Sequence, residues 1–340
     1  KWGLKLSNLS GKNKCNIYFE TKKTSLTEAI TTAMSNNPTM FASDDVDHNV
    51  RYIGANPNNY VYFNCSDYSN QSDSTCEKWR IIGVFNNVTK SDGTKENLVK
   101  IIRDEIIGYY SWDSSASSVN DGYGVNNWTD ADLMKLLNPG YDSVSVGGSL
   151  YYNAKSGTCY NSSNNATTSC DFTSTGLKND TTKNVIETVV WNLGGSASYD
   201  SSSNGLASHW YRYERGTTVY SGRPTTWTGK IGLMYLSDYG YATAGGTTTD
   251  RATCLAKELY NWHDVSDCYN NDYLFNSDYQ WTLTPYSVNA CNVLYVHSDG
   301  CIKNGYARNH SGVRPTLYLK SSISVDSGTG ESSNPYRLKF

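Results

Sequence analysis

The stretch G-V-R-P-T-L-Y-L at residues 312–319 shows the clearest strand pattern in this chain of 340 residues. Apolar residues occupy every second position, and polar or aromatic residues lie between them. Because successive side chains of a strand point to opposite faces, this alternation predicts a half-buried strand that anchors the segment before it. One face would carry Val313, Pro315, Leu317 and Leu319, and the other would carry Arg314, Thr316, Tyr318 and Lys320.

The segment before this strand starts with W-T-L-T-P-Y-S at residues 281–287 and continues as an irregular polar and aromatic run. Rigid Tyr rings supply contact area and short polar side chains supply hydrogen bonds, which is the chemistry of adaptable binding surfaces. The alternative is a polar loop surface without a ligand, since Tyr and Asn are abundant throughout the chain. The candidate ligand-binding residues are Ser287, Asn289, Asn292, Tyr295, His297, Ser298, Asp299, Lys303, Asn304, Tyr306, Arg308, Asn309, His310 and Ser311.

The apolar residues of the same run are expected to point inward, although their spacing does not alternate strictly. A bulge or turn at Ser-Asp-Gly, residues 298–300, explains the irregular spacing. The inward residues would be Val293, Val296, Ile302 and Ala307.

Elsewhere, runs of strand type alternate with runs of helix type, which predicts an α+β fold. Ser25 and Glu28 form a capping box for a helix that stops at Asn37-Pro38. The run at 79–86 is apolar on both faces and is expected in the middle of a packed sheet. The other expected strands are 60–64, 98–107, 231–237 and the short runs after Trp281; the other expected helices run from a Thr129 cap to Leu137, from Asp180 or Thr181 to Leu193, and from Arg251 to Trp262.

Composition restricts the class of protein. The chain has 28 Tyr and 9 Trp with 18% charged residues, whereas disordered chains are poor in aromatic residues and rich in charge. A net charge of −3 without long runs of like charge favours neither nucleic acid nor an anionic membrane as a partner. The sequence contains no run of 18 apolar residues, so no membrane span is predicted. We expect an extracellular or cell-surface protein without a cofactor.

Nine cysteines indicate an oxidising compartment. Eight of them form couples that close short loops, and a disulfide in each would contribute ~3 kcal/mol. Metal binding is the alternative, but all four spacings are too long for C-x-x-C and no histidines pair at helical spacing, so no metal site is predicted. Cys15 is left for a bridge upstream of Lys1 or a free thiol. The couples are Cys65 with Cys76, Cys159 with Cys170, Cys254 with Cys268, and Cys291 with Cys301.

Three blocks of sequence carry a resemblance to a known group. They are W-T-L-T-P-Y-S with G-V-R-P-T-L-Y-L, E-K-W-R-I-I-G-V-F-N-N at 77–87, and R-G-T-T-V-Y-S-G-R-P-T-T-W-T-G-K at 215–230. The chain resembles bacterial surface and phage domains of the C-type-lectin-like, formylglycine-generating-enzyme-like fold, including variable proteins diversified by retroelements. It is similar in particular to a surface-protein group of gut Firmicutes.

The resemblance implies a C-type-lectin-like domain over residues 25–340, in which the C-terminal strands form a platform for variable side chains. Residues 1–24 would be terminal strands of a preceding β domain or a linker. In diversified relatives, adenine-directed mutation of Asn codons produces such mixtures of residues. Lys303 departs from what an Asn codon ending in a pyrimidine yields, which argues against diversification here.

Three functions remain open at this point. The first is an adhesin or receptor-binding protein that recognises a protein or glycan on another cell or on a phage host. The second is a structural subunit that self-assembles into a pilus or surface filament. The third is a cysteine oxidase of the formylglycine-generating type that uses Cys291 and Cys301, with His297 and His310 as the local bases. We expect a binding protein rather than an enzyme, because no hydrolase motif or calcium-dependent sugar-binding motif is present.

Overall fold

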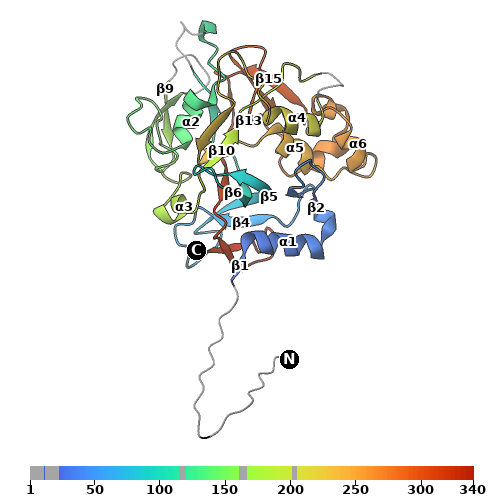
Figure 1. Ribbon diagram of the computed structural model, residues 1–340. Helices are drawn as coiled ribbons and strands as arrows, with labels where there is room; N and C mark the ends of the chain where they lie inside the picture. The colour runs from blue at the N-terminus through green and yellow to red at the C-terminus, as the bar shows by residue number, and fades with distance from the viewer. Residues whose placement is uncertain (1–10, 12–22, 115–119, 161–166, 201–204) are drawn as a thin grey trace.

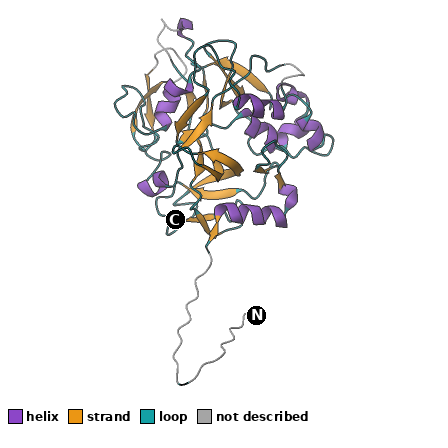
Figure 2. Cartoon of the chain, in the orientation of Figure 1, coloured by secondary structure: helices purple, strands orange, loops and turns teal. Residues whose placement is uncertain are grey.

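The computed structural model describes residue 11 and residues 23–114, 120–160, 167–200 and 205–340 (Figures 1 and 2). Most regular structure in these ranges is in strands, with short helices between them, so the α+β class is confirmed. Cys15 and most of the predicted strands at 1–24 lie outside the described residues. None of the described helices is long and apolar enough to cross a membrane.

Seven short α-helices and four 3-10 turns lie in the described ranges. In Figure 1, α4, α5 and α6 lie together on one side of the strands, and α1 lies at the lower end of the molecule. The α-helices are α1 (Leu26–Asn36), α2 (Asp132–Leu137), α3 (Asp180–Asn184), α4 (Ala207–Glu214), α5 (Leu236–Ala242), α6 (Arg251–Leu255) and α7 (Ser266–Asn270). The 3-10 turns are η1 (Pro38–Met40), η2 (Asn120–Gly122), η3 (Trp128–Asp130) and η4 (Leu259–Asp264).

Helix α1 begins where the sequence predicts. The Ser25 side chain accepts a hydrogen bond of 3.1 Å from the backbone N–H of Glu28, and Asn37 ends the helix before Pro38. Leu26 and Ile30 are buried, and the helix packs on the strands that form the largest sheet. The N-cap and the apolar stripe are both local features, so the sequence alone predicts them.

The largest sheet has seven antiparallel strands in the order β12-β17-β6-β5-β3-β2, and β4 pairs with the first half of β5. The long strand β5 is buried continuously from Trp79 to Phe85, as expected for a central strand. At Gly83 an added Cβ would lie 2.2 Å from the Val50 carbonyl oxygen, so only glycine permits β3 to approach here. The strands are β2 (Phe41–Ala42), β3 (Val50–Tyr52), β4 (Tyr60–Phe63), β5 (Glu77–Thr89), β6 (Lys95–Arg103), β12 (Ile231–Gly232) and β17 (Thr316–Leu319).

A second sheet has five strands in the order β15-β14-β13-β16-β7. Helix α5 is buried along its whole length and packs against both β3 of the first sheet and β13 and β14 of the second. Buried residues from both sheets belong to one hydrophobic core. The strands of the second sheet are β7 (Tyr109–Ser111), β13 (Gln280–Pro285), β14 (Asn292–Val296), β15 (Ile302–Tyr306) and β16 (His310–Gly312).

Three smaller sheets complete the described strands. The sheet β1-β18-β19 joins the two ends of the described body, because β1 pairs with β18 near the C-terminus. The other two are the hairpin β8-β9 and the pair β10-β11. Their bounds are β1 (Thr24–Ser25), β8 (Ser156–Tyr160), β9 (Thr167–Asp171), β10 (Val189–Asn192), β11 (Thr226–Gly229), β18 (Ser324–Ser327) and β19 (Arg337–Lys339).

The prediction of a half-buried strand at 313–320 is wrong. Strand β17 lies between β12 and β6, and Arg314, Thr316 and Tyr318 are buried as fully as the apolar residues that alternate with them. Arg314 is accommodated because its guanidinium donates to the carbonyl oxygens of Arg103 (2.8 Å) and Leu274 (3.0 Å). Both faces of this strand are therefore covered by other parts of the protein, although its sequence alternates between apolar and polar residues.

The long helix predicted up to Leu193 is also wrong in extent. Helix α3 ends at Asn184, and β10 follows it as a strand paired with β11. The cap is Asn179, whose side chain accepts from the N–H of Thr182 at 2.9 Å, rather than Asp180 or Thr181. The apolar residues near the end of the run are β-branched or aromatic, and pairing with β11 buries Val189 and Trp191 on one face.

Three further boundaries differ from the predictions. Helix α2 starts after Ala131, and Thr129 lies in the preceding 3-10 turn instead of capping it. The strand expected at 231–237 is short, because its second part forms α5, and β6 ends at Arg103 instead of Ile107. The helix expected over 251–262 is divided into α6 and η4.

Three of the four predicted disulfides are formed, and the fourth is not. Cys291 and Cys301 are free. They flank opposite ends of the β14–β15 ladder, in which Asn292 pairs with Tyr306 and Val296 with Ile302. A strand rises about 3.3 Å per residue, so the two cysteines are too far apart along the hairpin to form a bridge. The bonded pairs are Cys65–Cys76, Cys159–Cys170 and Cys254–Cys268, and these bonds are compatible with an oxidising, extracellular compartment.

Candidate functional site

The hairpin formed by β14 and β15 contains most of the candidate residues. Its turn falls at residues 297–301, as predicted, and Gly300 has a φ of +84°. The four residues predicted to point inward, Val293, Val296, Ile302 and Ala307, are all fully buried. Because Val293 and Val296 point to opposite faces of β14, both faces of the hairpin are partly buried, and the polar candidates lie between the buried residues.

The predicted surface residues differ in exposure. Ser311 is buried, because β16 is enclosed between β13 and β7, so its expected exposure is wrong. Tyr306, Asn309 and His310 are exposed. The others are partly exposed: Ser287, Asn289, Asn292, Tyr295, His297, Ser298, Asp299, Lys303, Asn304 and Arg308.

At the turn end of the hairpin, aromatic rings gather around His297. The ring of Tyr279 meets the imidazole of His297 edge to face at 4.7 Å and the ring of Tyr295 at 6.0 Å. Tyr295 also packs against Trp281, at 5.8 Å, and over Gly305, where an added Cβ would meet its ring at 3.0 Å. Burial raises the pKa of Tyr295 to about 12, so its hydroxyl stays protonated and can donate.

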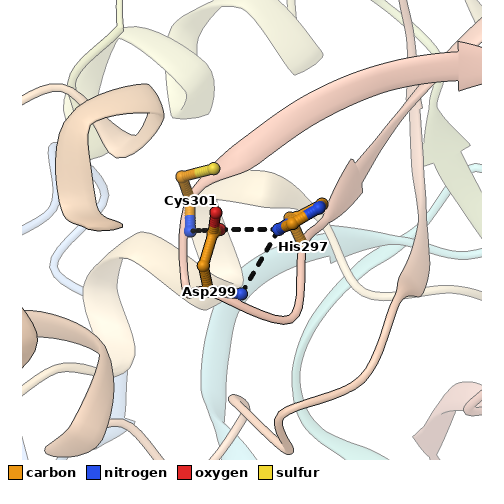
Figure 3. A group of neighbouring side chains, drawn as sticks. All are labelled: His297, Asp299 and Cys301. Atoms are coloured by element: carbon orange, nitrogen blue, oxygen red, sulfur yellow. Dashed lines mark hydrogen bonds and ion pairs between the residues drawn. The ribbon is translucent and has the colours of Figure 1, made fainter.

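The turn itself brings His297, Asp299 and Cys301 together (Figure 3). A carboxylate oxygen of Asp299 lies 2.7 Å from Nδ1 of His297 and accepts a hydrogen bond of 3.2 Å from the Cys301 N–H. Lys303 places its Nζ 3.4 Å from the other carboxylate oxygen. Imidazole, carboxylate and thiol are all metal ligands, so this turn contains a metal-ligand cluster that helical spacing rules do not detect.

The pKa values of Asp299 and Cys301 are shifted in opposite directions. Burial opposes ionisation of Asp299, but hydrogen bonds from Cys301 and His297 hold its pKa well below the usual value. Burial raises the pKa of the Cys301 thiol to about 12, and the Asp299 carboxylate contributes to the increase. Cys301 is therefore a protonated thiol at neutral pH in the absence of a metal, and it is a poor nucleophile.

At the open end of the hairpin, Tyr306 and Arg308 meet a segment remote in sequence. The ring of Tyr306 stacks on that of Tyr123 at 4.2 Å with an interplanar angle of 20°. The Arg308 guanidinium lies 4.6 Å from the centre of the Tyr123 ring and donates to the Gly122 carbonyl oxygen. Tyr306 remains 40% exposed, so the stacked pair presents an aromatic edge to solvent.

Hydrogen bonds from the Asn126 side chain hold the loop between β13 and β14. The Asn126 amide donates to the carbonyl oxygens of Tyr286 (2.9 Å), Asn289 (3.1 Å) and Asn292 (2.5 Å). Arg223 donates to the Ala290 carbonyl oxygen at 2.7 Å. The loop that carries the candidates Ser287 and Asn289 is consequently fixed by hydrogen bonds instead of moving freely.

Exposed large apolar side chains are concentrated on this sheet and its loops. Four of the seven in the described ranges lie there: Tyr109, Tyr279, Val288 and Tyr306, exposed by 41%, 43%, 53% and 40%. Tyr109 contacts the ring of His310 and donates to the carboxylate of Asp278. We call Tyr109, Tyr279, Tyr295, His297, Tyr306 and Arg308, with Tyr123, the aromatic surface. The sequence pattern does not identify Tyr109, Tyr123 and Tyr279 as members of this surface, because tertiary pairing brings them to it. Of the three, only Tyr279 could have been inferred from the sequence, since it lies two residues before Trp281.

A separate polar cavity of about 240 Å³ lies beside α2. Burial raises the pKa of Asp113 to about 7, and repulsion from Asp132 contributes to the shift. Asp113 accepts from the N–H groups of Val125 (2.7 Å) and Asp132 (3.2 Å), and Asp132 accepts from Ser114. The pair therefore takes up a proton near neutral pH. The cavity is lined by Asp113, Ser114, Val125, Asn127, Asp130, Asp132 and Lys135.

No protein-family model, curated protein or solved structure matches this chain. The geometry does not bring Cys291 and Cys301 into one site, so it provides no dithiol centre of the kind that the oxidase hypothesis requires. Burial raises the pKa of Cys291 as well. The aromatic surface and the turn cluster both carry side chains suited to recognition of a ligand.

Proposed function

We propose that this protein is an extracellular ligand-binding protein, an adhesin or receptor-binding component, that recognises its ligand through the aromatic surface. The proposed domain is C-type-lectin-like and covers residues 25–340. The ligand is a protein or glycan on another cell or on a phage host. The observation that carries the proposal is the concentration of partly exposed Tyr, His and Arg side chains on one sheet.

The chemistry of these side chains supports recognition. Tyrosine offers a large apolar ring and a polar tip with few rotatable bonds, so it gives up little conformational entropy on binding. Arg308 and His297 add directional donors beside the rings, and Asn126 holds the neighbouring loop between β13 and β14. Clustered exposed aromatic residues rimmed by polar groups are typical of interaction sites.

The position of the surface also supports display. In Figure 1 the strands labelled β13 and β15 lie towards the upper end of the molecule, whereas β1 and the C-terminus lie together at the lower end. The strands that carry most of the aromatic surface thus lie at the other end of the molecule from the small sheet that joins the two ends of the body.

A double substitution tests the proposal. Tyr279→Ala with Tyr306→Ala removes one exposed ring at each end of the hairpin while leaving the buried residues in place. Wild-type protein labelled with a fluorophore is applied to a glycan array and to intact epithelial cells, and the double variant is expected to lose binding. The matched control is Tyr220→Ala, since Tyr220 is 36% exposed and lies outside the five-stranded sheet.

Three outcomes would contradict the proposal: no binding of the wild type to either probe, equal binding of the double variant, or equal loss with Tyr220→Ala. Electron microscopy of the same preparations tests the filament alternative. Filaments of wild-type protein that disappear in the double variant would show that the aromatic surface joins subunits instead of binding another cell.

A further inference from the structure

The turn between β14 and β15 brings three different metal-ligating groups to one point. Nδ1 of His297, a carboxylate oxygen of Asp299 and Sγ of Cys301 all lie within 4.8 Å of one another (Figure 3). The pattern is H-x-D-x-C, in which the first and last residues are opposite each other across the hairpin. We propose that these three side chains bind a divalent transition-metal ion of the Zn²⁺ class. This goes beyond ligand recognition by the aromatic surface and does not depend on it.

The backbone of the turn is fixed before any ion binds. The N–H of His297 donates to the Cys301 carbonyl oxygen at 2.8 Å, and the N–H of Gly300 donates to the His297 carbonyl oxygen at 2.9 Å. Tyr239 from α5 donates to the Gly300 carbonyl oxygen at 2.6 Å, and the ring of Tyr269 from α7 packs directly on Gly300. Little conformational entropy is lost on binding, because the ligand residues are held by neighbouring helices.

Only small side-chain movements separate this arrangement from a coordination shell. Bonds of 2.0–2.3 Å at tetrahedral angles place ligand atoms roughly 3.4 Å apart, so separations of up to 4.8 Å need to contract modestly. Nδ1 of His297 lies 2.7 Å from the Asp299 oxygen and 3.3 Å from the Asp299 backbone nitrogen, so Nδ1 is the ring nitrogen that faces the turn. An ion bound between Nδ1 and the carboxylate would push these two groups apart slightly.

The set of ligands selects the type of ion. Thiolate and imidazole favour Zn²⁺, Co²⁺ and related ions, whereas Ca²⁺ and Mg²⁺ take six or more ligands that are almost all oxygen. Three protein ligands leave one tetrahedral position for water. Among the described cysteines, Cys301 is fully buried and free while six others are in disulfides, so its thiol remains available for coordination.

Binding changes protonation but transfers no electrons. The S–H bond of Cys301 breaks, an Sγ–metal bond forms, and the proton leaves to solvent. His297 binds the ion through Nδ1 as the tautomer that carries its proton on Nε2. When that tautomer and the Asp299 carboxylate coordinate the ion, the thiol proton is the one released to solvent.

The positive charge of Lys303 opposes binding of the ion. Its Nζ lies 3.4 Å from the second oxygen of Asp299, and its side chain is 37% exposed, so it can swing into solvent. Removing its charge should tighten binding because a cation no longer repels the ion or competes for Asp299. The substitution Lys303→Met keeps the apolar stem and gives a variant whose expected effect is a gain.

The test uses the full chain, freed of metal with a chelator and titrated with Co²⁺ with its disulfides intact. Wild-type protein is expected to develop the ultraviolet charge-transfer band of a thiolate–Co²⁺ bond with one ion per chain, and Zn²⁺ should abolish the band. Cys301→Ser is expected to lose the band, whereas Cys291→Ser, which removes the other free thiol, should keep it. Lys303→Met should lower the Kd for Co²⁺ several-fold.

Two results would overturn the proposal. One is the absence of a thiolate band in the wild type, which would make the turn a hydrogen-bonded network only. The other is a band that persists in Cys301→Ser or disappears in Cys291→Ser. Should Cys301→Ser fail to fold, His297→Gln provides the test, because it retains the thiol and should weaken Co²⁺ binding at least about tenfold, whereas an unchanged Kd would contradict the site.

Discussion

The two large sheets use polar and aromatic residues in opposite ways. In the seven-stranded sheet and its covering helix α5, Arg51 and Lys100 are at most 1% exposed and both pair with Asp238, which is also 1% exposed. Asp45 pairs with Arg51 at 2.7 Å, and the rings of Phe85 and Tyr235 pack against the cations. In the five-stranded sheet, similar residue types remain partly exposed. The buried ion pairs stabilise the fold, and the partly exposed side chains of the five-stranded sheet remain available for contact with a ligand.

The largest expected effect is the loss of the buried network. Asp238→Ala should lower the free energy of unfolding by about 3–5 kcal/mol, because it leaves Lys100 without its partner and Arg51 with one. Chemical denaturation measures this. Asp92→Ala, which removes an exposed carboxylate near Lys90 and its turn hydrogen bonds from Thr94, should lower the free energy of unfolding by no more than about 1 kcal/mol. Equal effects of the two substitutions on stability would contradict the distinction between buried ion pairs that stabilise the fold and exposed charges that do not.

Removing a disulfide next to the aromatic surface should have the next largest effect. The double substitution Cys254→Ala with Cys268→Ala should cost about 3 kcal/mol, because the bond closes a loop with a sequence separation of 14. It should also loosen α7, whose Tyr269 packs on Gly300. Cys291→Ser is the control, and denaturation curves that coincide for the two variants would contradict this expectation.

A smaller effect is expected from pH. The pKa of Asp113 in the folded protein, about 7, exceeds its ordinary value, so the folded state holds a proton that the unfolded state loses. The resulting stability is present at acidic pH and is lost as pH rises through 7. Asp132→Asn removes the neighbouring charge and should reduce the loss of stability between pH 5 and pH 8 by ~1 kcal/mol. Thermal unfolding at both pH values measures this. Asp326→Asn, which removes a carboxylate outside this cavity, should not change the difference, and an unaltered slope in Asp132→Asn would contradict the assignment.

The smallest expected effect on stability comes from the aromatic surface. Tyr279→Ala with Tyr306→Ala should change the free energy of unfolding by less than about 1 kcal/mol, since both residues lie at the surface and are 43% and 40% exposed. Loss of binding without loss of stability would separate recognition from folding. A large destabilisation would instead show that these rings belong to the structural core.

Several features followed from the sequence because they are local. The N-cap that Ser25 provides for the Glu28 N–H, the two-faced strand around Trp79, and the turn before Cys301 depend on residues close together in the chain. The three disulfides formed also join cysteines only 11 to 14 residues apart. Short loops bring such pairs together at little entropic cost, so their spacing is informative.

Other features failed because distant segments decide them. The run from Val185 to Leu193 fits a helical period, but pairing with β11 makes its second half a strand. Cys291 and Cys301 are spaced like the bonded pairs, yet the ladder between β14 and β15 holds them apart. Ser311 looks exposed on a polar run, and β7, some two hundred residues earlier, covers it.

The sequence by itself determined the α+β class, three disulfides and the approximate segment that carries the aromatic surface, since periodicity and spacing encode these. Only the tertiary structure decided which side chains stay exposed, which rings from residues 109, 123 and 279 join them, and that His297, Asp299 and Cys301 meet at one turn. Exposure and convergence depend on what packs against a residue from elsewhere in the chain. A one-dimensional pattern does not contain that information.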